Sequence, residues 1–137
     1  MKRILIVEDD ENERFTLARV LERAGCTVVS LPRADRVLEA LAEAPYDALI
    51  TDMMMPGTDG VSLARSVASR HPDMPIILTS AFHLFRAQIE RFDITKLHFV
   101  DKPIDLDRLL DLLGVKPGVG PNDPPGKSPP PPSPMLR

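Results

Sequence analysis

Short apolar segments alternate with longer amphipathic segments up to residue 113, and this alternation limits the folds that the chain can adopt. The apolar segments span residues 4–7, 26–31, 48–51, 75–79 and 97–100. Between and after them, residues 12–24, 34–43, 60–70, 84–91 and 106–113 suit helices, most clearly where apolar residues recur three and four positions apart. Repeated strand-then-helix units predict an α/β fold, a three-layer α/β/α sandwich around a five-stranded parallel sheet.

The composition changes abruptly near residue 114. Residues 114–137 are dominated by Pro and Gly, and they include four consecutive prolines at 129–132. Such a segment has too few apolar side chains to offset the entropy lost on ordering. We therefore expect one domain at 1–113 and a disordered tail at 114–137. The tail is either inert, or a polyproline II ligand or spacer.

Charge and hydropathy narrow the range of partners. The formal net charge is −3, which argues against direct nucleic-acid binding by this chain. No apolar run approaches the roughly 20 residues that a membrane span needs. Cys26 is the only cysteine, so an intramolecular disulfide is excluded and a reducing cytoplasm is the default location.

Reactive side chains follow four of the five predicted strands. In a parallel sheet these strand ends lie at one edge, where ligands of open α/β sheets bind. In chain order, the groups are Glu8-Asp9-Asp10, then Asp52, then Thr79-Ser80, and finally Asp101-Lys102. Each group alone is ordinary, since an acidic run often caps a helix and a Lys-Pro pair often marks a loop. Their occurrence together predicts a single site.

Carboxylates packed together repel each other, and a hard cation such as Mg²⁺ relieves that repulsion. One carboxylate in such a cluster can attack phosphorus and form an aspartyl phosphate. A lysine stabilises charge on the transferring phosphoryl group, and a hydroxyl can bond a phosphate oxygen afterwards. The residue types therefore indicate phosphoryl transfer to an aspartate.

The sequence resembles the receiver domains of two-component response regulators, in particular the single-domain, chemotaxis-type members. The resemblance covers residues 2–113 and implies a flavodoxin-like sheet of strand order 2-1-3-4-5. The matching segments are Ile4-Leu5-Ile6-Val7-Glu8-Asp9-Asp10, Asp52-Met53-Met54-Met55-Pro56-Gly57-Thr58-Asp59-Gly60, Ile76-Ile77-Leu78-Thr79-Ser80-Ala81 and Lys102-Pro103.

By this resemblance Asp52 is the phosphoacceptor and, with Lys102, the catalytic group. Mg²⁺ would be held by Glu8, Asp9, Asp52 and the backbone carbonyl of Met54, with Asp9 a direct ligand.

The resemblance also assigns the groups that respond to the phosphate. Ser80 matches the switch hydroxyl, Phe99 the switch aromatic residue and Lys102 the phosphate-contacting lysine. It further implies a cis bond between Lys102 and Pro103.

The implied function is that of a stand-alone response regulator in a phosphorelay. A histidine kinase or phosphotransfer protein would donate the phosphoryl group. The chain would assist its own phosphorylation and dephosphorylation, but it would not otherwise be an enzyme. The surface of the fourth helix, fifth strand and fifth helix would then control a downstream protein. The chain would be a monomer or a weak, phosphorylation-dependent homodimer.

One further expectation and two alternative functions complete this interpretation. Apolar Met54 and Phe82 beside the site predict slow loss of the phosphate, because neither side chain can orient a water molecule. A degenerate receiver acting as an unphosphorylated docking module is one alternative, but no acid, lysine or hydroxyl is missing. A phosphohydrolase of the haloacid-dehalogenase type is another, but Asp52-Met53-Met54 lacks the second acid of the Asp-x-Asp motif.

Overall fold

The computed structural model describes residues 2–55, 57–81 and 94–116. The predicted helix at 84–91, Phe82 and residues 117–137 of the predicted tail lie outside the described residues. In chain order the elements are β1 Arg3–Val7, α1 Glu11–Arg23, β2 Thr27–Leu31, a 3₁₀ turn Ala34–Arg36, α2 Val37–Glu43, β3 Ala48–Asp52, β4 Met54–Met55, β5 Thr58–Asp59, α3 Gly60–Arg70, β6 Ile76–Ser80, β7 Leu97–Asp101 and α5 Leu106–Leu113.

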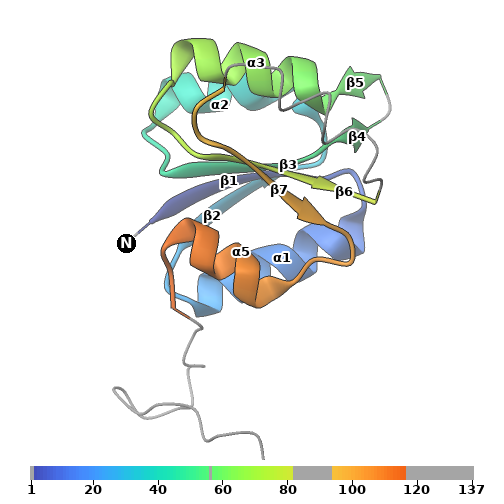
Figure 1. Cartoon of the computed structure of the whole chain (residues 1–137), viewed down its shortest axis with the longest axis vertical. Coiled ribbons are helices and arrows are strands. Elements are labelled where there is room, and N and C mark those ends of the chain that lie inside the picture. The colour runs from blue at the N-terminus through green and yellow to red at the C-terminus, as the bar shows by residue number, and fades with distance from the viewer. Residues whose placement is uncertain (1, 56, 82–93, 117–137) are drawn as a thin grey trace, which may run out of the picture.

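The long strands form one sheet in the order β2-β1-β3-β6-β7, and all neighbouring pairs are parallel (Figure 1). Since β6 and β7 are the fourth and fifth long strands, this is the predicted order 2-1-3-4-5. The sheet and its flanking helices confirm the flavodoxin-like α/β/α fold.

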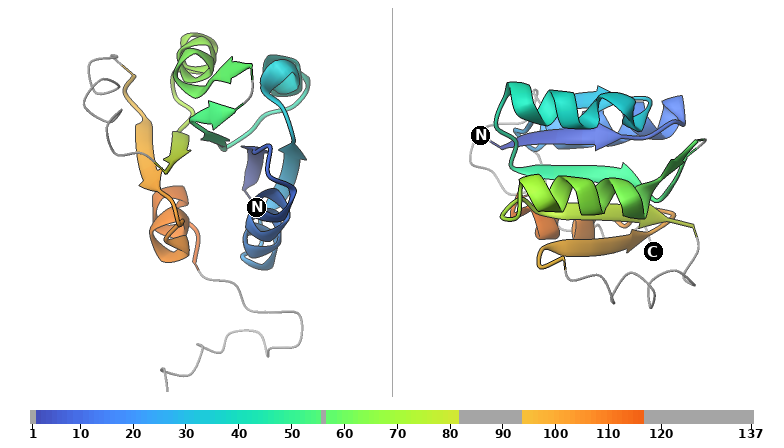
Figure 2. Two further views of the ribbon diagram at one scale, coloured as in Figure 1. Left: turned by 90° about the vertical axis from the view of Figure 1, so that its right-hand side faces the viewer. Right: turned by 90° about the horizontal axis from the view of Figure 1, so that it is seen from above.

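Helices α1 and α5 cover one face of the sheet, and α2 and α3 cover the other (Figures 1 and 2). Successive side chains of a strand point to opposite faces, so each strand contributes to two cores. Leu5 and Val7 of β1 pack with the helices α2 and α3. Ile4 and Ile6 pack with α1 and α5 instead. Burial on both faces explains why the strands are continuous apolar runs.

Two local features differ from the sequence prediction. The predicted helix at 34–43 starts as a 3₁₀ turn and becomes α-helical only at Val37. No side chain caps either segment, so no cap hydrogen bond fixes α geometry in the first turn. The hairpin of β4 and β5 was not predicted, and it projects beyond the end of β3.

Aspartates begin three of the helices. Asp10, Asp59 and Asp105 accept hydrogen bonds from backbone amides in the first turns of α1, α3 and α5. Gly114 follows the last residue of α5 and caps the helix in a left-handed conformation with φ of 69°. The peptide bond between Lys102 and Pro103 is cis, as the resemblance implied. Among the described residues, no helix combines the length and apolar character needed to cross a membrane.

Gly60, the first residue of α3, lies against the backbone at the end of β3. A Cβ atom at this position would be 2.6 Å from the Cα atom of Met53 and 2.7 Å from the carbonyl oxygen of Asp52. Both are backbone atoms, which cannot move aside as the end of a flexible side chain can. Glycine at 60 therefore allows α3 to start directly beside Asp52.

We predict that Gly60→Ala lowers the free energy of unfolding by about 1–3 kcal/mol, although alanine is the better helix former. Urea denaturation measures the change. Ser66→Ala, at an exposed position of the same helix, is the matched control and should be nearly neutral. Equal stability of the two variants would contradict the close approach.

Candidate functional site

Backbone hydrogen bonds continue past the strand ends and hold the predicted site residues together. The Met53 amide donates to the Thr79 carbonyl at 2.9 Å, just beyond β3. The Lys102 amide donates to the Ser80 carbonyl at 2.7 Å, just beyond β7. These bonds place the ends of β3, β6 and β7 at one edge of the sheet, next to the end of β1.

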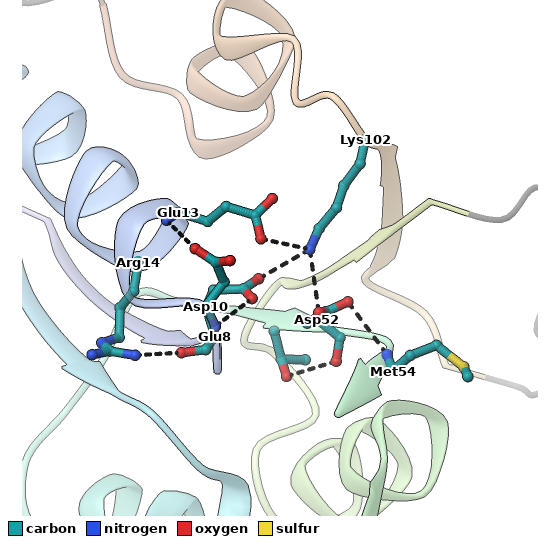
Figure 3. Close-up of polar contacts among 8 residues, drawn as sticks. Glu8, Asp10, Glu13, Arg14, Asp52, Met54 and Lys102 are labelled. Atoms are coloured by element: carbon teal, nitrogen blue, oxygen red, sulfur yellow. Dashed lines mark hydrogen bonds and ion pairs between the residues drawn. The ribbon is translucent and has the colours of Figure 1, made fainter. Parts of the chain in front are cut away.

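The acidic run after β1 divides into two roles. Asp10 is the cap of α1, because its Oδ1 accepts from the Glu13 amide at 2.9 Å. Glu8 is 4% exposed, and its Oε1 accepts from the Asp10 amide at 3.0 Å. The Arg14 side chain donates to the Glu8 carbonyl at 2.9 Å. Asp9, between Glu8 and Asp10, is exposed. Figure 3 shows Glu8 directed towards Lys102 and Asp52.

Asp52 ends β3 and is 8% exposed. Its Oδ1 accepts from the Met54 amide at 3.3 Å, and its Oδ2 accepts from Lys102 at 3.2 Å. The Met54 side chain is 53% exposed at the rim of the site. The predicted phosphoacceptor is thus buried but close to an open side of the molecule.

Lys102 connects the cluster (Figure 3). Its Nζ lies 3.2 Å from Glu8 Oε2, 3.2 Å from Asp52 Oδ2 and 3.3 Å from Glu13 Oε2. The first two contacts join residues that the sequence assigned to the site. The third, from α1, was not predicted.

Burial opposes ionisation at this edge of the sheet. Burial raises the pKa of the Glu8 carboxyl to about 7. The Asp10 amide opposes that rise, the Asp52 carboxylate adds to it, and the Lys102 ammonium opposes it. Burial also disfavours the Lys102 ammonium, but the carboxylates of Asp52 and Glu8 outweigh this and raise the pKa of Lys102 above its usual value. Lys102 therefore remains charged.

Three acidic side chains in the described part of the chain form a cluster suited to a metal ion. Ligand oxygens of Glu8, Asp9 and Asp52 all lie within 4.8 Å of one another. The donors are all carboxylate oxygens, which Mg²⁺ prefers, so the chemistry of the cluster fits this ion.

The predicted switch residues occupy two neighbouring strands. Ser80 is the last residue of β6 and is buried. Phe99 lies in β7, pairs with Leu78, and packs in part against the core under α2 and α3. The structure thus brings Lys102 together with the three clustered carboxylates. Phe99 lies two residues before the end of β7, set back from this cluster in the sheet.

Glu13 is the site residue that sequence reasoning missed. An aspartate followed three residues later by a glutamate resembles the capping-box pattern at a helix start, and Asp10 and Glu13 have this spacing. The pattern identifies the helix start, but it predicts a glutamate that bonds its own cap. It gives no sign that Glu13 contacts Lys102.

Known proteins with similar sequences and structures share this architecture. Residues 4–114 match the response regulator receiver domain family. The DNA-binding transcriptional regulator NtrC of Escherichia coli K12 is 34% identical over 110 residues, which is 80% of this chain but only 24% of NtrC. The response regulator receiver protein CpdR of Brucella abortus is 40% identical over 82 residues, covering 60% of this chain and 68% of CpdR.

A solved structure supports the same assignment. The apo receiver domain of nitrogen regulatory protein C superposes with a TM-score of 0.74 at 32% identity, covering 82% of this chain and 91% of that domain. The matched family, the sheet order and the clustered strand-end residues agree. This chain belongs to the response regulator receiver domain family.

Proposed function

We propose that Asp52 accepts a phosphoryl group from a histidine kinase or a histidine phosphotransfer protein. Receiver domains interact with such proteins and act as phosphoacceptor switches. The observation that supports the proposal for this chain is the buried Asp52 carboxylate, which shares the Lys102 ammonium with Glu8. An ordinary surface aspartate has neither the burial nor the paired lysine.

The residues present suit in-line transfer from a phosphohistidine. A carboxylate oxygen of Asp52 attacks phosphorus, an O–P bond forms, and the P–N bond to the donor imidazole breaks. The imidazole leaves with the electron pair and takes up a proton. The Lys102 ammonium, 3.2 Å from Asp52 Oδ2, is placed to stabilise negative charge on the phosphoryl oxygens. This chain therefore supplies the nucleophile and one fixed positive charge.

Glu8, Asp9 and Asp52 would hold Mg²⁺, with the Met54 carbonyl as a further ligand by family resemblance. When bound, the ion would supply additional positive charge beside the transferring group. Glu8 would contribute its ionised form, because a metal ligand must lose its proton.

Ser80 and Lys102 are proposed to bond the new phosphate, which adds a charge of about −1.5 to −2. Moving a two-state equilibrium from 1:99 to 99:1 requires about 5.5 kcal/mol. A hydrogen bond to a charged group contributes about 1.5–3 kcal/mol. Both residues must therefore contribute, and inward packing of Phe99 would supply the remainder.

The phosphorylated state is proposed to act through the surface of β7, α5 and the helix predicted at 84–91. The proposed working unit spans residues 1–113, since α5 ends at Leu113. We further propose a cytoplasmic protein that is a monomer or a weak, phosphorylation-dependent homodimer. Stand-alone action and the role of the Pro-rich tail stay predictions.

We predict that Asp52→Asn abolishes labelling by a cognate phosphohistidine donor or by acetyl phosphate, because the amide is not a nucleophile. Mass spectrometry or a phosphate-affinity gel measures the phosphorylated fraction. Asp73→Asn, an exposed residue before β6, is the matched control and should be labelled normally. Labelling of Asp52→Asn to the wild-type level would contradict the proposal.

Mg²⁺ should stabilise the folded chain more strongly as the pH rises through about 7, the pKa of Glu8. Between about pH 4.5 and 7 the metal-free folded chain keeps a Glu8 proton that the unfolded chain releases, so this group lowers stability as the pH rises. At Glu8 a bound Mg²⁺ ion would take the place of that proton, so the loss of stability would be reversed. Thermal melts with and without Mg²⁺ at pH 5.5 and 8.0 measure the difference.

Glu8→Gln should bind Mg²⁺ more weakly and lose most of this pH dependence. Glu22→Gln, near the opposite end of α1, should behave like the wild type. A Mg²⁺-induced shift in Tm of the same size at both pH values would count against Glu8 as a ligand.

Phosphate loss should be slow in the wild type and faster in Met54→Asn. The exposed thioether of Met54 cannot donate a hydrogen bond, whereas an amide can orient an attacking water. The lifetime of the phosphorylated chain after donor removal measures the effect. Met54→Leu, which adds no polar group, should keep the long lifetime. A wild-type half-life of seconds would refute slow loss.

A further inference from the structure

Lys102 is bonded to one more carboxylate than phosphoryl transfer to Asp52 requires. A lysine ammonium has three hydrogens to donate. Its three carboxylate neighbours lie at nearly equal distances, with Glu13 at 3.3 Å and both Glu8 and Asp52 at 3.2 Å. In this arrangement each hydrogen has a carboxylate acceptor, so a phosphoryl oxygen must displace one of them.

The Glu13 carboxylate is available to Lys102 because Glu8, and not Glu13, accepts the hydrogen bond from the Asp10 amide. In a capping box, the glutamate three residues after the cap accepts from the backbone amide of the cap residue. Here the Asp10 amide donates to Glu8 Oε1 at 3.0 Å instead. The Asp10 side chain still accepts from the Glu13 amide at 2.9 Å, so the first turn of α1 stays fixed. The Glu13 carboxylate then extends to Lys102 (Figure 3).

The three acceptors differ in exposure. The side chains of Glu8 and Asp52 are 6% and 10% exposed, whereas that of Glu13 is 47% exposed. Returning Glu13 to water therefore costs less than stripping a partner from a buried carboxylate. Among the described acceptors of Lys102, Glu13 therefore forms the ion pair that takes the least free energy to break.

We propose that Glu13 is a positioning residue that holds Lys102 back in the unphosphorylated state and thereby limits phosphoryl uptake at Asp52. The inference rests on the proposed function of Asp52. Before transfer, Glu13 occupies one hydrogen of Lys102. After transfer, its negative charge repels the phosphoryl group nearby. Both effects favour the unphosphorylated chain, and release of Glu13 favours the phosphorylated one.

The effect should be modest and sensitive to salt. Half-exposed ion pairs shift equilibria by about two- to fivefold, and salt screens them. We expect Glu13→Gln to bind beryllium trifluoride, a phosphoryl mimic, about two- to fivefold more tightly than the wild type in saturating Mg²⁺. Acetyl phosphate should label it faster by a similar factor. Both differences should shrink in about 1 M NaCl, where the Debye length is about 3 Å.

Glu11→Gln is the matched control, because it removes the same charge from the same turn of α1. It should leave beryllium trifluoride affinity near the wild-type value. In a Lys102→Met background, Glu13→Gln should lose most of its effect, since its partner is gone. A role limited to helix stability would not depend on Lys102 in this way.

The outcomes separate the two proposals. Weaker binding or slower labelling of Glu13→Gln would overturn the inference and make Glu13 an aid to Lys102. Equal behaviour of the Glu13→Gln and Glu11→Gln variants would also overturn it, while leaving the role of Asp52 intact. A wild-type chain that neither binds beryllium trifluoride nor is labelled would overturn the proposed function and this inference together.

Discussion

The structure at the carboxyl edge of the sheet depends on one balance of charge. Glu8 and Asp52 are buried side by side, and like charges removed from water are costly unless a partner compensates them. Lys102 is that partner, and it reaches both carboxylates from β7. The parallel sheet makes the arrangement possible, because it brings the ends of β1 and β3 within reach of the lysine that follows β7. Fold and site are therefore not separable features of this chain.

Much of the fold could be predicted because its signals are local and repeated. The apolar runs at β1, β3 and β6 are long enough to identify buried strands. The helix predicted at 60–70 from its spacing of apolar residues has the same bounds as α3. The β4–β5 hairpin could not be predicted, since two residues per strand show no periodicity. The 3₁₀ turn before α2 has the spacing of a helix, and sequence period alone does not distinguish the two.

The candidate site was predictable in so far as it lies at strand ends. Glu8, Asp9, Asp52 and Lys102 follow buried strands, so topology alone brings them together. The family resemblance separated Asp9 from Asp10 as a metal ligand, but the residue types alone could not, because the two side chains are chemically identical. Only the backbone path makes Asp10 the cap of α1. The contact between Glu13 and Lys102 depends on the angle at which α1 leaves the sheet, and no sequence pattern specifies that angle.

The hydrogen bond from the Lys102 amide to the Ser80 carbonyl has a consequence for how this chain tolerates insertions and deletions. This bond accompanies the last pair of β6 with β7, Ser80 with Asp101, so Lys102 directly follows the paired part of β7. Removing one residue within β7 would turn every following side chain to the opposite face of the sheet. Lys102 would then point away from Asp52, although the Lys-Pro pair would still be present in the sequence. The role of the Lys-Pro pair in this chain therefore depends on the length of β7 before it.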